Sequence, residues 1–202
     1  MTADPLDLLA ALLRYPDAAV RRDAPALLDA LAGTGGSRAG AVAPLADAFA
    51  RLSGGELEES YARTFDMSPD ASLDVGWHLY GEDYSRGAFL VRVRALLRRC
   101  RVPERAELPD HLTLLLPLLA RLDGEEGEDL ACGAVLPALR KVLEAIEDGA
   151  SPWRSVLVAA RDDLVRRFGP ARPVPAPTGE KGLRPYDAKP ATLASEIPVW
   201  RW

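Results

Sequence analysis

Apolar residues recur along most of the chain at spacings of three and four, which is the pattern of amphipathic α-helices. Leucine and alanine dominate, and runs of β-branched residues are absent. Near the start, Asp4 and Pro5 suit a helix N-terminus, and the apolar positions from Leu6 to Leu13 share one face. Pro16 is expected to stop this helix. The pattern predicts an all-α protein.

The same periodicity predicts seven further helices, each bounded by Gly, Pro or acidic residues. They span residues 23–31, 38–52, 57–66, 85–100, 109–122, 129–148 with a bend at Pro137, and 151–168. A short aromatic segment covers 73–80, and loops are expected at 67–72 and 124–128. The segment 109–122 is apolar nearly all round, so we expect it at the centre of the bundle.

The composition and periodicity of the sequence change after Gly169. Seven of the 17 prolines lie in residues 170–202, which have no helical period. We therefore expect one helical domain over residues 1–169, followed by an irregular, proline-rich tail over 170–202. The tail carries five basic and three acidic residues, so a total charge of −5 leaves −5 − 2 = −7 on the helical domain. It ends with Trp200 and Trp202, which are unusual in a merely solubilising tail.

The acidic composition restricts the classes of partner. A net charge of −5 is repelled by nucleic acid and by anionic lipid, but it attracts basic peptides. No apolar run reaches the roughly 20 residues of a membrane span, and the N-terminus lacks the basic region of a signal peptide. The only cysteines, Cys100 and Cys132, form no CxxC pair, so free thiols are favoured over a disulfide. A reduced, cytoplasmic protein is expected.

The sequence does not indicate an enzyme. It contains none of the motifs GxGxxG, GxxxxGK[ST], HExxH or GxSxG. Two separated histidines, His78 and His111, are too few for a metal cluster. Neighbouring acids such as Glu58 and Glu59 diverge by about 100° on a helix, unlike a catalytic carboxylate pair. No cofactor or metal of its own is expected.

Three short stretches are less easily explained by packing. In the first, Tyr61 and Phe65 are either core aromatics or the lining of a binding trough. Asp66 ends the same helix, where an acid opposes the helix dipole, so we expect it to have a partner or a role.

The other two stretches are YGEDYSRG at 80–87 and ELPDHL at 107–112. The acids of the first precede a helix, where Asp83 or Ser85 suits a capping role. In the second, Pro109 and Asp110 suit a helix start, but capping does not require His111 beside them.

Together these stretches resemble motifs of the NarJ/TorD/DmsD family of molybdoenzyme-maturation chaperones. Residues 61–66 are similar to a Y-x-x-x-F-D element, residues 107–112 to E-x-P-D-H, and residues 80–87 to Y-G-D-x-R-x-R-G of the NarJ branch, also called the nitrate reductase delta subunit. The order and spacing agree over about residues 5–168. Glu82 and Tyr84 depart from the motif, which usually has Asp and Arg there.

The resemblance implies a non-catalytic helical chaperone. It would bind the N-terminal segment of an apo molybdopterin oxidoreductase subunit and assist molybdenum cofactor insertion before membrane attachment or export. A basic amphipathic peptide suits the acidic domain and an apolar trough. The residues expected at the peptide are Tyr61, Phe65, Asp66, Tyr80, Glu82, Arg86, Glu107, Pro109, Asp110 and His111.

Alternatives to this interpretation remain open. A permanent helical adaptor of an oxidoreductase complex would use the tail tryptophans as anchors. The tail could instead occupy the client groove of its own chain. A homodimer formed by domain swapping is also compatible with loops at 67–72 and 123–128. His111, whose charge can change near neutrality, makes pH-sensitive binding a further hypothesis.

Overall fold

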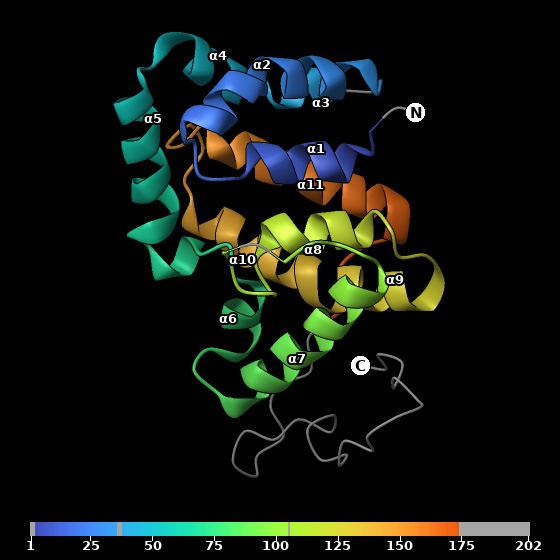
Figure 1. Cartoon of the computed structure of the whole chain (residues 1–202). Coiled ribbons are helices and arrows are strands. Elements are labelled where there is room, and N and C mark those ends of the chain that lie inside the picture. The colour runs from blue at the N-terminus through green and yellow to red at the C-terminus, as the bar shows by residue number, and fades with distance from the viewer. Residues whose placement is uncertain (1–2, 36–37, 105, 174–202) are drawn as a thin grey trace.

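The computed structural model describes residues 3–35, 38–104 and 106–173, and these ranges contain helices but no strands (Figure 1). The α-helices are α1 (Pro5–Leu12), α2 (Ala18–Gly33), α3 (Arg38–Ala41), α4 (Ala43–Arg51), α5 (Gly54–Tyr61), α6 (Val75–Tyr80), α7 (Tyr84–Arg99), α8 (Leu112–Leu119), α9 (Gly124–Leu130), α10 (Leu136–Ala145) and α11 (Trp153–Phe168). Two π-helical turns, η1 (Ala62–Asp66) and η3 (Ala131–Val135), and one 3₁₀ turn, η2 (Pro69–Ala71), complete the order. The predicted all-α, single-domain bundle is confirmed.

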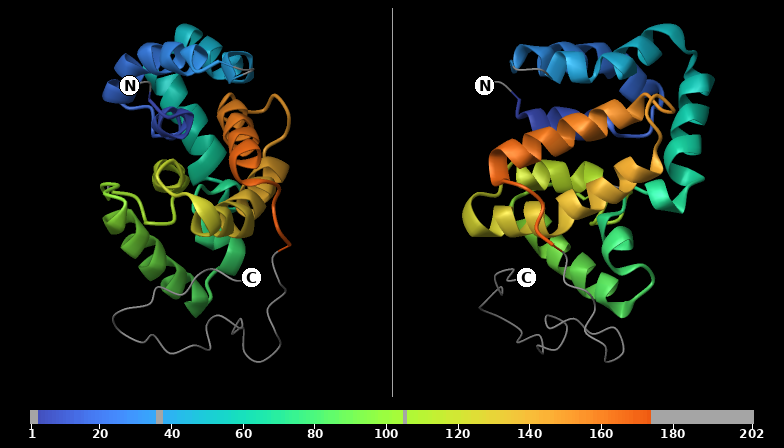
Figure 2. Two further views of the ribbon diagram at one scale, coloured as in Figure 1. Left: turned by 90° about the vertical axis from the view of Figure 1, so that its right-hand side faces the viewer. Right: turned by 180° about the vertical axis from the view of Figure 1, so that it is seen from behind.

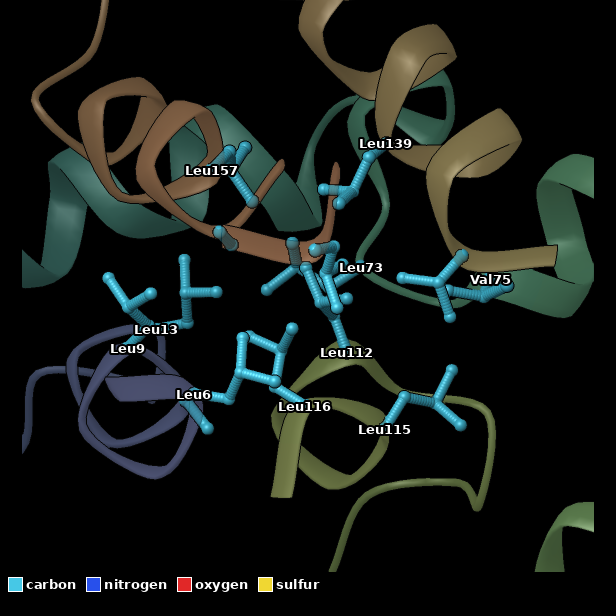
Figure 3. Close-up of a cluster of buried hydrophobic side chains, with 14 of the residues drawn as sticks. Leu6, Leu9, Leu13, Leu73, Val75, Leu112, Leu115, Leu116, Leu139 and Leu157 are labelled. Carbon is cyan, nitrogen blue, oxygen red and sulfur yellow. The ribbon is translucent and has the colours of Figure 1, made fainter. Parts of the chain in front are cut away.

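The core lies where α1, α8, α10 and α11 meet. Figure 3 shows leucines of α1 facing those of α8, with side chains of α10 and α11 closing the cluster. Every leucine of α8 is buried, as its apolar sequence predicts. Burying one such side chain contributes roughly 1.5–3 kcal/mol. The cluster drawn in Figure 3 includes Leu6, Leu9, Leu13, Leu73, Val75, Leu112, Leu115, Leu116, Leu139 and Leu157.

The remaining helices surround this core. Helices α2, α3 and α4 cover one end, and α5 runs along an edge of the molecule towards α6 and α7 at the other end (Figures 1 and 2). The chain then returns to the middle through α8, so segments from both halves of the sequence meet there. This return places residues 107–112 beside residues 73–77, which the sequence separates by more than 30 positions.

Two helix boundaries differ from the sequence-based expectations near the N-terminus. Helix α2 begins at Ala18 rather than residue 23, because the Asp17 carboxylate accepts the Val20 N–H at 2.8 Å and caps it earlier. Pro25 therefore lies inside the helix instead of at its start. The helix expected over 38–52 is divided into α3 and α4 at Val42, just before Pro44 in the first turn of α4.

The acidic loop expected at 124–128 is instead the first part of α9. Gly124 adopts a positive φ of 62°, which suits glycine at the turn into a helix. Glu125 and Glu126 occupy the first turn, where the helix dipole favours acids. The expectation was wrong because acidic residues are compatible with both a loop and a helix N-terminus. The loop expected at 67–72 contains the short turn η2.

Pro137 distorts the long helical segment as predicted, and the distortion precedes it. In η3 the Leu136 N–H bonds to the Ala131 carbonyl, which is the i→i+5 pattern of a π-helix. In the same pattern the Cys132 carbonyl would accept a hydrogen bond from residue 137, but Pro137 has no N–H to donate. The Arg172 N–H supplies that hydrogen bond at 2.8 Å. The spare carbonyl therefore holds the start of the C-terminal segment against η3.

Arg172 also fastens this segment through its side chain. Its guanidinium pairs with the buried Asp129 and, at 3.5 Å, with Glu128. The rest of the proline-rich tail, including Trp200 and Trp202, lies outside the described residues. Cys132 is buried and Cys100 is half-buried, and both thiols are free, as expected.

Candidate functional site

Two of the three stretches singled out in the sequence meet at the start of α6. Residues 73–75 and 110–112 run antiparallel: the Val75 N–H bonds to the Asp110 carbonyl at 3.0 Å, and the Leu112 N–H bonds to the Leu73 carbonyl at 2.9 Å. This short pairing keeps residues 110 and 111 extended. Helix α8 therefore begins at Leu112 rather than at residue 109 as expected, and Pro109 is buried in the preceding turn.

Asp110 is completely enclosed at this junction. Its Oδ2 accepts the Gly76 N–H at 3.0 Å, and thereby caps α6 from a distant part of the chain. A Cβ on Gly76 would lie 2.6 Å from that oxygen, so the close approach requires glycine. Burial raises the pKa of Asp110, and the nearby Asp74 carboxylate raises it further, against the opposing effect of Arg86.

Arg86 connects the second stretch to the third. Its Nη2 lies 2.9 Å from Asp74 Oδ2 and 3.4 Å from Asp110 Oδ2, and its guanidinium lies over the Trp77 ring, 6.0 Å from the centroid. Asp110 and Arg86 thus hold α6, α7 and the start of α8 together. The sequence interpretation placed Asp110 where it could receive a client arginine, but here its carboxylate has no exposed surface and already faces Arg86.

His111 is the N-terminal cap of α8. Its Nδ1 lies 2.7 Å from the Thr113 hydroxyl and 3.4 Å from the Thr113 N–H, which it accepts. Burial lowers the pKa of His111, while the carboxylates of Glu107, Asp74 and Asp66 act to raise it. Accepting the backbone N–H requires an unprotonated Nδ1, so the neutral ring suits the cap.

The first stretch belongs to an aromatic cluster beneath the end of α1. The Tyr61 hydroxyl donates to the Leu13 carbonyl at 3.0 Å, and its ring packs edge-on against Phe65 and Trp153 at centroid distances of 4.9 and 5.2 Å. Tyr61 and Phe65 are both buried, in keeping with their reading as core aromatics. Burial, with the Asp66 and Glu107 carboxylates, raises the pKa of Tyr61.

Acidic and apolar side chains gather on the surface above this cluster. Asp66 and Glu107 both influence the pKa of Tyr61 and of His111, so the two carboxylates flank the same small region. Asp66 is exposed and forms no hydrogen bond or salt bridge with another described residue. Its position at a helix end, which the helix dipole disfavours, is therefore not explained by an ion pair among the described residues.

Three exposed apolar side chains, which sequence reasoning missed, complete this region. Met67 is 78% exposed beside Asp66, Leu108 is 46% exposed beside Glu107, and Tyr15 is 44% exposed with its ring 5.5 Å from that of Tyr61. For Met67 and Leu108 the available signal was an apolar residue directly next to a motif acid, whereas Tyr15 had no such signal. We call this region the acidic–apolar surface: Tyr15, Asp66, Met67, Glu107, Leu108 and His111.

Comparison with protein families identifies the family of the chain. The model of the Nitrate reductase delta subunit family matches residues 14–159. The chain belongs to this family. Its members are chaperones of molybdoenzyme maturation, of the NarJ/TorD type, and they are associated with the catalytic subunits of those enzymes rather than with catalysis of their own. No curated protein matches the sequence.

Not all residues expected at the peptide site of this chain lie together. Tyr80 is half-buried against Phe89 at a centroid distance of 5.6 Å, and Glu82 is exposed on the turn made by Gly81, whose φ is 60°. Both lie at the C-terminal end of α6, whereas Asp110 and His111 lie at its N-terminal end. The predicted set is therefore divided by the length of α6. Asp83 caps α7, as its position indicated.

Within the described ranges, the chain has no group of three or more His, Cys, Asp or Glu side chains placed to hold a metal ion. The described helices include none that is long and apolar enough to cross a membrane.

Proposed function

We propose that this chain is a cytoplasmic chaperone that binds the N-terminal segment of an apo molybdopterin oxidoreductase subunit, of nitrate reductase or a related enzyme. In this role it keeps the client competent for molybdenum cofactor insertion and assembly. The family supports a maturation role, and the observation that carries the binding site is the acidic–apolar surface. Exposed apolar side chains beside carboxylates that pair with no described residue suit a basic amphipathic peptide.

Each part of this surface has a distinct role in the proposal. Met67, Leu108 and Tyr15 offer apolar contact, while Asp66 and Glu107 receive lysine or arginine. His111, Asp110 and Arg86 fix the loop that carries Glu107 and Leu108, so they act as positioning residues. Phe65 and Tyr61 form the floor below, and Pro109 shapes the turn.

The test is a binding titration of the full chain against a labelled N-terminal peptide of the client, in which fluorescence anisotropy reports the bound fraction. Asp66→Asn and Glu107→Gln are each expected to weaken binding about two- to fivefold, in line with exposed ion pairs. Asp29→Asn, at an exposed position on α2, is the matched control and should bind as the wild type does. Equal affinity for all four proteins would place the peptide elsewhere, whereas no binding of the apo subunit would reject the function itself.

Asp110→Ala is a poor probe of client contact. Removal of a fully buried, hydrogen-bonded carboxylate is expected to destabilise the fold. The exposed positions therefore replace it in the experiment.

A permanent adaptor subunit is the competing function. Pull-down of the tagged chain from molybdenum-starved and molybdenum-supplied cells separates the two. A chaperone should be recovered with the apo catalytic subunit, and the amount of that subunit should increase under molybdenum starvation. An adaptor should instead be recovered in constant ratio with the finished, cofactor-loaded enzyme.

A further inference from the structure

Helix α7 has two apolar faces, of which the bundle uses one. Phe89, Val93, Leu96 and Leu97 pack inwards against α6 and α8. At 100° per residue, Tyr84, Ala88, Val91 and Ala95 lie on the opposite side. Figure 2 shows α7 at the edge of the described helices.

The outer face exposes two large apolar side chains, with Arg98 and Arg99 on its flanks. Tyr84 is 89% exposed and Val91 is 68% exposed, the most exposed tyrosine and valine in the described chain. Ala88 and Ala95 lie between and beyond them, at spacings of four, three and four residues. This is the spacing of a helix–helix seam, and the alanines allow the two backbones to approach closely.

Charges at the ends of α7 are opposite in sign. Glu82 is exposed just before the helix, and no described residue pairs with it. Arg98 is 73% exposed near the helix end, 3.7 Å from Glu104, and Arg101 follows it on the surface. A second α7 in the antiparallel direction would therefore bring the acidic start of each helix to the basic end of the other.

The positions are also symmetric about Val91. Tyr84 and Arg98 each lie seven residues from it, so a two-fold axis at Val91 places Tyr84 of one copy against Arg98 of the other. A guanidinium over an aromatic face is a favourable contact. The same axis pairs Val91 with itself, which is the property of an isologous interface.

From this self-complementary face we propose that the chain forms a homodimer through an antiparallel α7–α7 pair. The proposal does not depend on client binding, because the acidic–apolar surface lies at the other end of α6 and remains free. One pair of helices buries less than the roughly 1,600 Å² of a standard interface. We therefore expect a dissociation constant in the micromolar range, around 1–100 μM.

Sedimentation equilibrium of the full chain over a concentration series tests the dimer. Val91→Glu places two carboxylates against each other at the axis and is expected to leave only monomer. Val165→Glu is the matched control, since Val165 is 40% exposed on α11, and it should dimerise as the wild type does. A wild-type chain that stays monomeric well above the expected range, or a Val91→Glu variant that still dimerises, would overturn the proposal.

A charge exchange tests the direction of the pair. Glu82→Arg and Arg101→Glu should each weaken the dimer roughly three- to tenfold, because the axis at Val91 places residue 82 of one copy opposite residue 100 of the other, next to Arg101, and each change breaks two symmetric pairs. The double variant should recover most of the affinity, since the pairs form again with reversed sign. A double variant weaker than either single variant would contradict the antiparallel arrangement.

Cysteine cross-linking tests the register, in a Cys100→Ser background. Val91→Cys should give an oxidised dimer, because the two side chains meet at the axis. Ala88→Cys should not, since antiparallel pairing separates the two copies of residue 88 by six residues, about 9 Å along the axis. Cross-linking of both variants would indicate a parallel pair and refute the proposed geometry.

Discussion

Substitution of Gly76 by alanine tests the junction at which Asp110 is enclosed. Gly76 is the second residue of α6, and its N–H bonds to Asp110. In an unhindered helix the change is favourable by up to about 1 kcal/mol. Here the new Cβ would lie 2.6 Å from Asp110 Oδ2 and 3.1 Å from Phe89 Cδ1. The enclosed carboxylate has to move, and its hydrogen bond to the backbone is strained or lost.

The expected magnitude follows from these opposing effects. A hydrogen bond to a charged group contributes about 1.5–3 kcal/mol, so after a helix gain of about 1 kcal/mol Gly76→Ala should destabilise the protein by about 0.5–2 kcal/mol. For a domain of this size the melting temperature falls by about 2–4 °C per kcal/mol, or about 1–8 °C in all. Urea and thermal unfolding followed by circular dichroism measure both quantities.

Gly55 provides a matched control, because it is also the second residue of its helix, α5, and a Cβ there would meet nothing within 4 Å. Gly55→Ala should leave stability unchanged or raise it slightly. The cost of Gly76→Ala should also disappear in an Asp110→Ala background, where the obstructing oxygen is gone. If Gly76→Ala is as stable as Gly55→Ala in the wild-type background, the described packing of Asp110 is wrong.

Three further changes test other parts of the fold. Because the pKa of Asp110 is raised in the folded state, its ionisation is less favourable there than in the unfolded chain. Wild-type stability should fall relative to Asp110→Asn as pH rises from about 4 through the raised pKa, and urea melts showing a pH-independent difference would contradict this. Arg101 ends α7 with a φ of 55°, so Arg101→Gly should stabilise by up to about 1 kcal/mol, and a lower melting temperature would count against strain there. Tyr61→Phe removes the hydroxyl bonded to the Leu13 carbonyl and should cost about 1–2 kcal/mol in urea melts, whereas an unchanged midpoint would show that this bond contributes nothing.

The candidate site illustrates which part of a site can be found from sequence. The motif residues were identifiable because acids and aromatics occurred where packing and capping did not require them. Their arrangement was not identifiable: Asp110 was expected to face a client, but it is turned inwards to Gly76 and Arg86. Arg86 and Gly76 lie 24 and 34 positions from Asp110 in the sequence, so no local pattern could reveal these contacts.

Local sequence patterns were enough to predict the class of the fold and most helix positions. Helical periodicity, an Asp cap followed by proline, and an all-apolar segment at α8 are local signals, because each acts within one or two turns. Local signals were ambiguous where two elements compete for one residue. Asp23 resembled a cap, but Asp17 begins α2, and the acids after Gly124 begin a helix that resembled a loop.

Long-range packing determined which motif side chains are exposed to a partner and which are buried and hold the neighbouring segments in place. The pairing of residues 73–75 with 110–112 delays the start of α8, encloses Asp110 and makes His111 the cap. The same folding brings Tyr15, Asp66 and Glu107 to one region from three separate parts of the chain. Burial and distance set the pKa of each group and its access to a partner, and both arise only when distant segments pack together.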